Sequence, residues 1–407
     1  MKITVDVALP FSTYKILPES NVVNSKREGQ TITFTIDEAD QFFSFVFDDA
    51  YKGSTLHLFA NSIDEDSPKS SNEGLIYFGP GYHRLEEPLK ISNGENVYIA
   101  GGAVVHGSIS LNNNEGSNIS GRGILISTEP GGLVLGVSNS TNIHLDGIIV
   151  RSHRNPGWTV GFHQVSGARA TNLKIVSPRY ASTDGIDISN SSDILVSNCF
   201  IRTCDDAIAI KGLTKGSPSS SPPNENMLFE NLHLWNDCNN AICLGAETRA
   251  KYYENIHFNN IDVISSFDDK YHHEELDERS VMTIVSLEGT YFRNIKWENI
   301  RVNRCERLIS LSFKDEFWFG SIKGDQSTPG LIEDVTFKNI SVNSNSGSKI
   351  ANEILLQGWH KENTPTKKIM NVTFDNVVIE GKKIKSESNI MTNNTDSLRI
   401  VTNLLFQ

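Results

Sequence analysis

A short unit recurs along the chain from about residue 96 onward, and this repetition limits the possible folds more than any other feature. Each copy starts with Asn or Asp and continues with apolar residues at alternating positions, as in Asn96-Val97-Tyr98-Ile99. The copies begin at Asn96, Asn118, Asn142, Asn172, Asp193, Asn226, Asn255, Asn294, Asp334 and Asn371. Several copies continue into a second strand after a further asparagine, at Asn259, Asn299, Asn339 and Asn376. A period of two indicates β-strands, and no stretch of useful length has a helical period.

The spacing of these copies predicts a right-handed parallel β-helix of about ten coils. Consecutive anchors lie 21 to 40 residues apart. The shorter intervals fit one coil with tight turns, and the longer ones fit a coil that carries a loop. Asparagine suits such turns because it tolerates the left-handed backbone region and can form side-chain ladders. Stacked coils would bury one continuous core of Ile, Val, Leu and Phe. We therefore expect an all-β chain whose β-helix spans residues 76–407.

The first part of the chain, residues 1–75, has a different pattern. Strand-like runs occur at 31–36, 42–47 and 55–60, and their separation is typical of hairpins. We expect a small antiparallel β-sandwich here. The polar stretch at 64–72 is then the linker to the β-helix.

The charge of the chain limits its partners. The net charge of −12 argues against nucleic acid and anionic membranes, which both require a basic surface. No apolar run approaches the roughly 20 residues of a membrane helix. The N-terminus lacks the apolar block of a signal peptide, so we expect a cytoplasmic protein, or a secreted one whose export signal has been removed. The sequence does not indicate the oligomeric state.

The five cysteines are Cys199, Cys204, Cys238, Cys243 and Cys305. Their number is odd and none forms a Cys-x-x-Cys pair, so a disulfide framework is not expected. We interpret them as buried thiols inside the solenoid rather than as a metal or redox site.

Two acidic motifs stand out within the repeats. Asp184 lies in Ser182-Thr183-Asp184-Gly185, and Asp205-Asp206 follows 21 positions later, each motif opening a short strand. If Ile186, Ile208 and Ile242 face the core, then Asp184, Asp206 and Asn240 occupy equivalent positions on successive coils, which lie roughly 4.8 Å apart. Like charges placed side by side raise each other's pKa. Such crowding favours a site that must hold one proton and one base.

These motifs resemble those of the polygalacturonases of glycoside hydrolase family 28. Ser182-Thr183-Asp184-Gly185 and Asp205-Asp206 match the first two family motifs. The family's Gly-His-Gly is replaced by Asn239-Asn240-Ala241, and the strand at 280–286 lacks the Arg-Ile-Lys motif that holds the galacturonate carboxylate in the family. Family 49, the dextranases and isopullulanase, looks similar because it keeps the three aspartates without those two motifs. The chain resembles a divergent member of this clan.

The resemblance implies the chemistry of the site. It implies an inverting glycosidase in which Asp205 is the general acid, while Asp184 and Asp206 activate the water. No cofactor or metal ion is expected, and the expected partner is a carbohydrate. Asn240, which replaces the family histidine, is expected to contact substrate or water.

Further candidates come from strand parity and loop position. Lys211 shares the parity of Asp205 and should face outward, and Glu247 ends the next strand, so both are candidates for contacts with sugar hydroxyls. Trp235, Trp318 and Trp359 are candidates for stacking on sugar faces. The alternation of Trp158 with Val160 and Phe162 indicates instead that Trp158 belongs to the core.

Several functions remain open. The missing basic motif favours a neutral α-glucan of the dextran or pullulan type, and a polygalacturonase or pectin-type hydrolase is the nearest alternative. A β-helix polysaccharide lyase would use the same three aspartates to bind calcium. A glycan-binding β-helix without activity would use them as a structural ladder.

Overall fold

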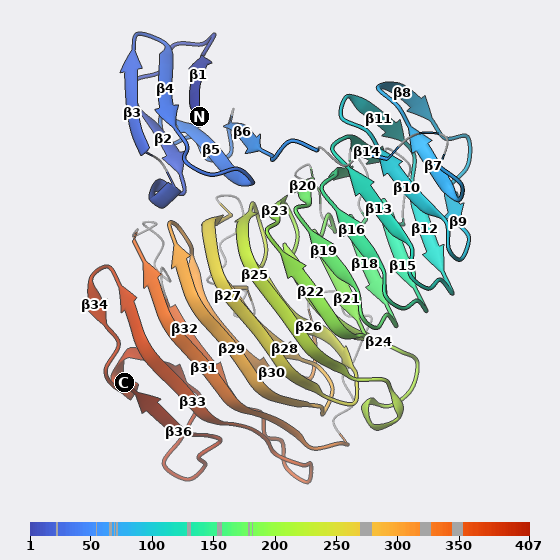
Figure 1. The fold of residues 1–407 in the computed structure, drawn as a ribbon. Helices are drawn as coiled ribbons and strands as arrows, with labels where there is room; N and C mark the ends of the chain where they lie inside the picture. Colours follow the sequence, from blue (N-terminus) through green and yellow to red (C-terminus); the bar gives the residue numbers. More distant parts are fainter. Residues whose placement is uncertain are drawn as a thin grey trace. The chain divides into compact units, whose positions relative to one another are not determined.

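The computed structural model describes residues 1–21, 23–53, 55–64, 67–68, 70, 72–127, 132–152, 157–177, 180, 182–268, 279–317, 327–343 and 353–407. Two compact units, Met1–Asp66 and Ser67–Gln407, divide the chain. Both consist almost entirely of strands (Figure 1). No helix within these ranges is long and apolar enough to cross a membrane.

The N-terminal unit is a small β-sandwich of two antiparallel sheets. One sheet has the order β1–β4–β3 and the other the order β2–β5–β6. Their bounds are β1 (Lys2–Asp6), β2 (Tyr14–Leu17), β3 (Val23–Glu28), β4 (Thr31–Thr35), β5 (Gln41–Phe47) and β6 (Thr55–Ala60), with a 3-10 turn η1 (Glu19–Asn21) after β2. Phe34 on β4 packs edge-on against Phe43 and Phe45 on β5, so the two sheets share one aromatic core. The three runs expected to be strands correspond to β4, β5 and β6.

The second unit is a right-handed parallel β-helix, as the repeats predicted. Its first six coils contribute one strand to each of three parallel ladders. The first ladder contains β7 (Leu75–Phe78), β10 (Asn96–Ile99), β13 (Asn118–Gly121), β16 (His144–Asp146), β19 (Arg169–Thr171) and β22 (Ser192–Ser197). The second contains β8 (Gly81–Arg84), β11 (Ala103–His106), β14 (Ile124–Ser127), β17 (Ile149–Ser152), β20 (Lys174–Val176) and β23 (Phe200–Thr203).

The first two ladders merge at β25. This strand pairs with both β22 and β23, and each later coil continues with one long strand in place of two short ones. The long strands are β25 (Asn224–Asn236), β27 (Tyr253–Ser266), β29 (Tyr291–Val302), β31 (Gly330–Val342) and β33 (Lys367–Ile379). The chain ends with β34 (Lys382–Lys383) and β36 (Val401–Phe406), which both pair with β33. The 3-10 turns η2 (Pro218–Ser220) and η4 (Glu387–Asn389) lie in the connections.

The third ladder is an eleven-stranded sheet with one strand from each coil, close to the ten coils that we predicted. Its strands are β9 (Leu89–Ile91), β12 (Ile109–Asn112), β15 (Leu135–Ser138), β18 (Val160–His163), β21 (Ile186–Ser189), β24 (Ile208–Leu213), β26 (Ile242–Arg249), β28 (Met282–Ser286), β30 (Arg307–Phe313), β32 (Glu353–Gln357) and β35 (Met391–Thr392). The predicted register is confirmed, because Ile186 pairs with Ile208 and Ile208 with Ile242. All three isoleucines are fully buried.

Asparagine ladders hold the turns at a constant position. Asn226, Asn255 and Asn294 have positive φ angles and donate from one side chain to the next along the helix. Inside the coils, an aromatic stack follows the same direction: Phe229, Phe258, Trp297, Phe337, Phe374 and Phe406 lie with neighbouring ring centroids 4.6 to 5.5 Å apart. Side chains in one register therefore stack coil upon coil. Residues that precede neighbouring strands of the third ladder are brought together in the same way.

Candidate active site

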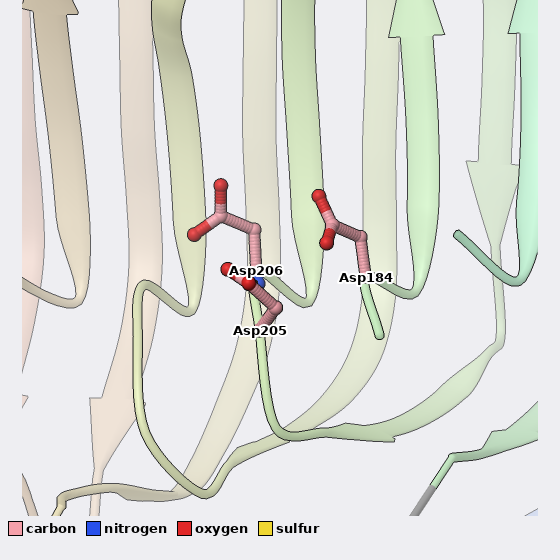
Figure 2. A group of neighbouring side chains, drawn as sticks. All are labelled: Asp184, Asp205 and Asp206. Carbon is pink, nitrogen blue, oxygen red and sulfur yellow. The ribbon is translucent and has the colours of Figure 1, made fainter. Parts of the chain in front are cut away.

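Three carboxylates meet on the turns that lead into β21 and β24. Asp184 precedes β21 by two residues, and Asp206 precedes β24 by two residues, with Asp205 beside it. Figure 2 shows Asp205 and Asp206 on one turn and Asp184 on the neighbouring turn. One oxygen atom from each of the three lies within 4.8 Å of the others. The backbone fixes this arrangement, because the Gly185 amide donates to the Asp206 carbonyl (2.8 Å).

Asp205 accepts hydrogen bonds on both carboxylate oxygens. The backbone amide of Ser182 donates to Oδ2 (2.7 Å) and that of Asp206 donates to Oδ1 (3.0 Å). The side-chain amide of Asn239 also donates to Oδ1. Three N–H donors hold the carboxylate in a fixed orientation. Asp205 is half-buried, whereas Asp184 and Asp206 are buried.

Asp206 is held by Asn240, the residue at the equivalent position on the next coil. The Asn240 side-chain amide donates to Asp206 Oδ1 (2.8 Å), and Asn240 Oδ1 accepts from the Ser280 amide (2.9 Å) and the Thr283 hydroxyl (2.7 Å). Burial, followed by the charges of Asp205 and Asp184, raises the pKa of Asp206 well above its ordinary value. Asn240 therefore positions a carboxylate that tends to keep a proton.

Asp184 contacts a buried lysine instead. Lys211 Nζ lies 3.0 Å from Asp184 Oδ2 and 3.2 Å from Asp187 Oδ1. Burial raises the pKa of Asp184 to about 6, with the Lys211 charge opposing this shift and the Asp205 charge adding to it. Burial opposes the charge of Lys211, but Asp184 and Asp187 outweigh it and raise the pKa of the ammonium well above its ordinary value. Lys211 is thus a charged side chain inside the protein.

The carboxylates line a pocket of about 220 Å³. Glu247 adds a fourth acid to its wall, and among the described residues Lys211 is the one basic side chain there. Apolar side chains also contribute to the lining, namely Trp158, Cys243, Val285 and Phe317, beside the polar Ser182, Asn239 and Asn240. An apolar surface beside convergent polar groups is typical of a small-molecule or sugar subsite.

Several predicted site residues line this pocket. They are Asp184, Asp205, Asp206, Asn240, Lys211 and Glu247. Lys211 was expected to face the solvent, but it is 6% exposed, because it lies between two carboxylates and its Nζ lies 4.1 Å from the centroid of the Trp158 ring. Trp158 was expected in the core. It is half-buried and lines the pocket, because it precedes β18 and does not follow that strand's alternation.

The predicted stacking tryptophans are not gathered at the pocket. Trp235 is fully buried, donates to Asp237 Oδ1 (3.0 Å) and is covered by the Arg202 guanidinium at 4.2 Å, so it has no face for a sugar and that prediction is wrong. Trp359 is half-buried and follows β32, four ladder steps from β24, outside the pocket lining. Trp318 lies outside the described residues.

Sequence reasoning also missed a disulfide. Cys204 and Cys238 are bonded, whereas we expected every cysteine to be a buried thiol. Cys199, Cys243 and Cys305 are free and buried. The bond joins the turn of Asp205 to the turn of Asn239. Spacing gave no signal for it, because two cysteines 34 positions apart become neighbours only once the coils stack.

Comparisons with known proteins place the chain in a family. The model of glycosyl hydrolases family 28 matches residues 89–390. Exo-poly-alpha-D-galacturonosidase of Dickeya chrysanthemi is 28% identical over 186 residues, which are 44% of this chain and 29% of that protein. The chain therefore matches less than a third of the length of this curated relative.

Two solved structures share the fold at low sequence identity. Dex49A from Penicillium minioluteum has a TM-score of 0.67 at 14% identity, covering 97% of this chain and 78% of that one. The family 28 exopolygalacturonase of Yersinia enterocolitica has a TM-score of 0.61 at 12% identity, covering 100% of this chain and 96% of that one. Because the family model spans most of its length, the chain belongs to glycosyl hydrolases family 28, a family of glycosidases.

Proposed function

We propose that the β-helix, residues 76–407, is an inverting glycoside hydrolase in which Asp205 is the general acid and Asp184 with Asp206 activates the water. The observation that carries this proposal is the convergence of three carboxylate oxygens within 4.8 Å of one another at a pocket that combines polar and apolar side chains. Cleavage of a glycosidic bond requires one carboxylic acid for the leaving oxygen and one carboxylate for water or carbon.

The surroundings of each carboxylate support a division of roles. Asp184 and Asp206 come from successive coils and can share one water between them, while Asp205 faces the pocket from beside Asp206. Burial raises the pKa of both Asp184 and Asp206, so the buried pair is able to retain a proton in the free protein. For Asp205 to act as the acid, that proton must transfer from Asp184 or Asp206 to Asp205 before the glycosidic bond breaks. The site's three carboxylates then exchange one proton during the cycle.

The stereochemistry of the reaction requires its own test. Inverting glycosidases usually separate acid and base by about 6.5–9.5 Å, and retaining ones by about 5–5.5 Å. In this site one oxygen from each carboxylate lies within 4.8 Å of the others, which is shorter than the usual inverting separation. We propose inversion because the resemblance to the clan implies it and because two carboxylates are available to hold one water. A retaining mechanism with Asp184 or Asp206 as the nucleophile is the second candidate.

The charge of the pocket supports a neutral glycan such as an α-glucan. Four acids line the pocket, and its described basic residue, Lys211, is already paired with Asp184 and Asp187. The outward positions of β28, the strand without the family's basic motif, hold Thr283 and Val285. Arg279 precedes this strand, but it donates to the Cys238 carbonyl (3.3 Å) and is not among the residues that line the pocket. A sugar carboxylate would meet negative charge here.

Polygalacturonate is the alternative substrate. It is supported by the names of the relatives, an exo-poly-alpha-D-galacturonosidase and an exopolygalacturonase. A calcium-dependent lyase is less well supported, because Lys211 Nζ already neutralises one side of Asp184 where a cation would bind. A glycan-binding protein without activity would not need a buried pair of carboxyl groups with raised pKa values.

The experiment is a comparison of wild type with Asp205→Asn on dextran, pullulan, polygalacturonate and rhamnogalacturonan, measured as reducing-sugar release. We expect release from a neutral glucan and a loss of about 10²-fold or more in the variant. Proton NMR of the first product anomer distinguishes inversion from retention. Equal activity of variant and wild type contradicts the role of Asp205, and absorbance from an unsaturated product supports the lyase.

A further inference from the structure

A second, buried layer of charged side chains lies next to the three pocket carboxylates. It consists of Lys211 on β24 and Asp187 on β21, with side chains 8% and 3% exposed. Both side chains point away from the core, because Ile186 and Ile188 flank Asp187 and face inward, as Ile210 does beside Lys211. Asp187 is not among the residues that line the pocket, so its interaction with the reaction centre passes through its neighbours.

Lys211 is held from three sides. Its Nζ lies 3.0 Å from Asp184 Oδ2, 3.2 Å from Asp187 Oδ1 and 4.1 Å from the centroid of the Trp158 ring. Asp187 interacts with Lys211 through this ion pair and also with the neighbouring Asp184 carboxyl group. Burial, followed by the charge of Asp184, raises the pKa of Asp187 well above its ordinary value. A buried ion of this kind is costly unless its partners remain in place.

We propose that Asp187 and Lys211 form a positioning pair for Asp184: Lys211 holds Asp184 as the ionised base, and Asp187 anchors Lys211. This inference rests on the proposed role of Asp184. It assigns to the second aspartate of Thr183-Asp184-Gly185-Ile186-Asp187 a function that the resemblance does not give. Lys211 is accordingly a charge that serves the base from inside the protein rather than a ligand for the sugar.

The two members of the pair should act on Asp184 in opposite directions. Removing the positive charge of Lys211 leaves two buried carboxyl groups facing each other, which favours the protonated form of Asp184 and raises its pKa. Replacing Asp187 removes the buried carboxyl group that competes with Asp184 for a proton and for Lys211, which favours the ionised form of Asp184 and lowers its pKa. A residue that only fills space would not produce such opposite shifts.

Other titratable groups face this layer and remain unchanged in both variants. Asp205 and Asp206 lie above it, Glu247 and Cys243 face it from β26, and His163 lies on the neighbouring strand β18. Burial lowers the pKa of His163, so this side chain adds no charge near neutral pH. The effect of each substitution can therefore be assigned to the charge that it removes.

The experiment follows the titration of Asp184 itself. Protein labelled with ¹³C at aspartate Cγ is titrated by NMR, and Asp184→Asn identifies the signal. In wild type we expect a midpoint at about 6, in line with the raised pKa of this carboxyl. Lys211→Met should raise the midpoint and Asp187→Asn should lower it, each by about one pH unit or more. Asp262→Asn is the matched control, because Asp262 is a buried partner of Arg301 (2.6 Å) on β27, away from the pocket.

Kinetics give the second readout. The acidic limb of the kcat profile should shift in the same directions as the midpoints, because the base must be ionised. Loss of a general base lowers kcat by about 10²- to 10⁴-fold, and Asp187→Asn should lower it by less than that. The KM of this variant should stay unchanged. Midpoints that stay at the wild-type value, or that shift in the same direction in both variants, overturn the proposal.

The two proposals fail in distinguishable ways. The NMR titration does not require turnover, so opposite shifts in a protein without activity on any glycan would support the pair and contradict the proposed hydrolase. If Lys211→Met does not fold, the isosteric Asp187→Asn alone still decides the sign. A midpoint that rises in Asp187→Asn refutes the anchoring role.

Discussion

The disulfide between Cys204 and Cys238 offers a prediction whose magnitude follows from the chain. The two cysteines are 34 positions apart. In the chain-entropy account, a disulfide that closes a loop of this length stabilises the folded state by about 4 kcal/mol. Unfolding the β-helix unit, Ser67–Gln407, changes the entropy by about 0.7 kcal/mol/K in total, at about 2 cal/mol/K per residue. Removing the bond should therefore lower the melting temperature by about 5 °C.

The assay compares wild type with Cys204→Ser/Cys238→Ser by circular dichroism, each with and without reductant. Reductant should lower the melting temperature of wild type to that of the double variant and leave the variant unchanged. Thiol titration of the denatured protein should find three free cysteines before reduction and all five afterwards. If reduction frees all five and the melting temperature does not fall, the loop-closure reasoning is wrong. If all five thiols react without reductant, the bond does not form.

The remaining predictions concern the carboxylates. Activity should decline as the pH falls through about 6, because burial raises the pKa of Asp184 to about that value and the base must be ionised. Stability should show the opposite trend: the advantage of wild type over Asp184→Asn in melting temperature is largest below about pH 4 and is lost as the pH rises to about 6, since the folded protein retains the proton longer. An advantage that grows with pH would refute the burial argument. Asn240→Ala should cost about 1–3 kcal/mol of stability and more activity than its stability loss explains, because Ser280 and Thr283 lose their acceptor and Asp206 loses a donor. Urea denaturation alongside kcat measures both.

The presence of the disulfide also bears on the cellular compartment of the protein. Disulfides persist in oxidising compartments and are rare in the cytosol. We infer from Cys204–Cys238 that the protein meets an oxidising environment. The thiol titration above tests this inference when it is applied to protein isolated from its native compartment.

Much of the fold was predictable because every coil of the β-helix uses the same pattern of strands and turns. Apolar alternation defines the strands, and asparagine defines the turns through its tolerance of positive φ. The register followed from Ile186, Ile208 and Ile242 alone, since these side chains must face the same core. Once the register is known, Asp184, Asp206 and Asn240 must lie on adjacent turns. The central part of the candidate site was therefore contained in the repeat.

The parts that were missed depend on local departures from that repeat. Trp235 lies where β25 shifts its pairing with β27, between Leu234 and Trp235, so simple alternation does not predict its burial. Trp158 lies before its strand begins and turns toward the pocket. Parity correctly directed Lys211 away from the core, but it could not show that Asp184, Asp187 and Trp158 cover it. Direction follows from the period, whereas burial depends on neighbours from other coils.

The balance of charge in the site connects its mechanism with its substrate. A polyuronide hydrolase requires a cation that is available to the sugar carboxylate, and Lys211 is the described basic residue at the pocket. If Lys211 serves Asp184, as its two short ion pairs indicate, it is not available to the substrate. The internal use of Lys211, the basic residue in the described part of the lining, and the apolar Val285 on β28 therefore lead to the same expectation, a neutral sugar. Hydrolysis of polygalacturonate but not of dextran would contradict both arguments together, because a cation would then have to be available to the sugar carboxylate.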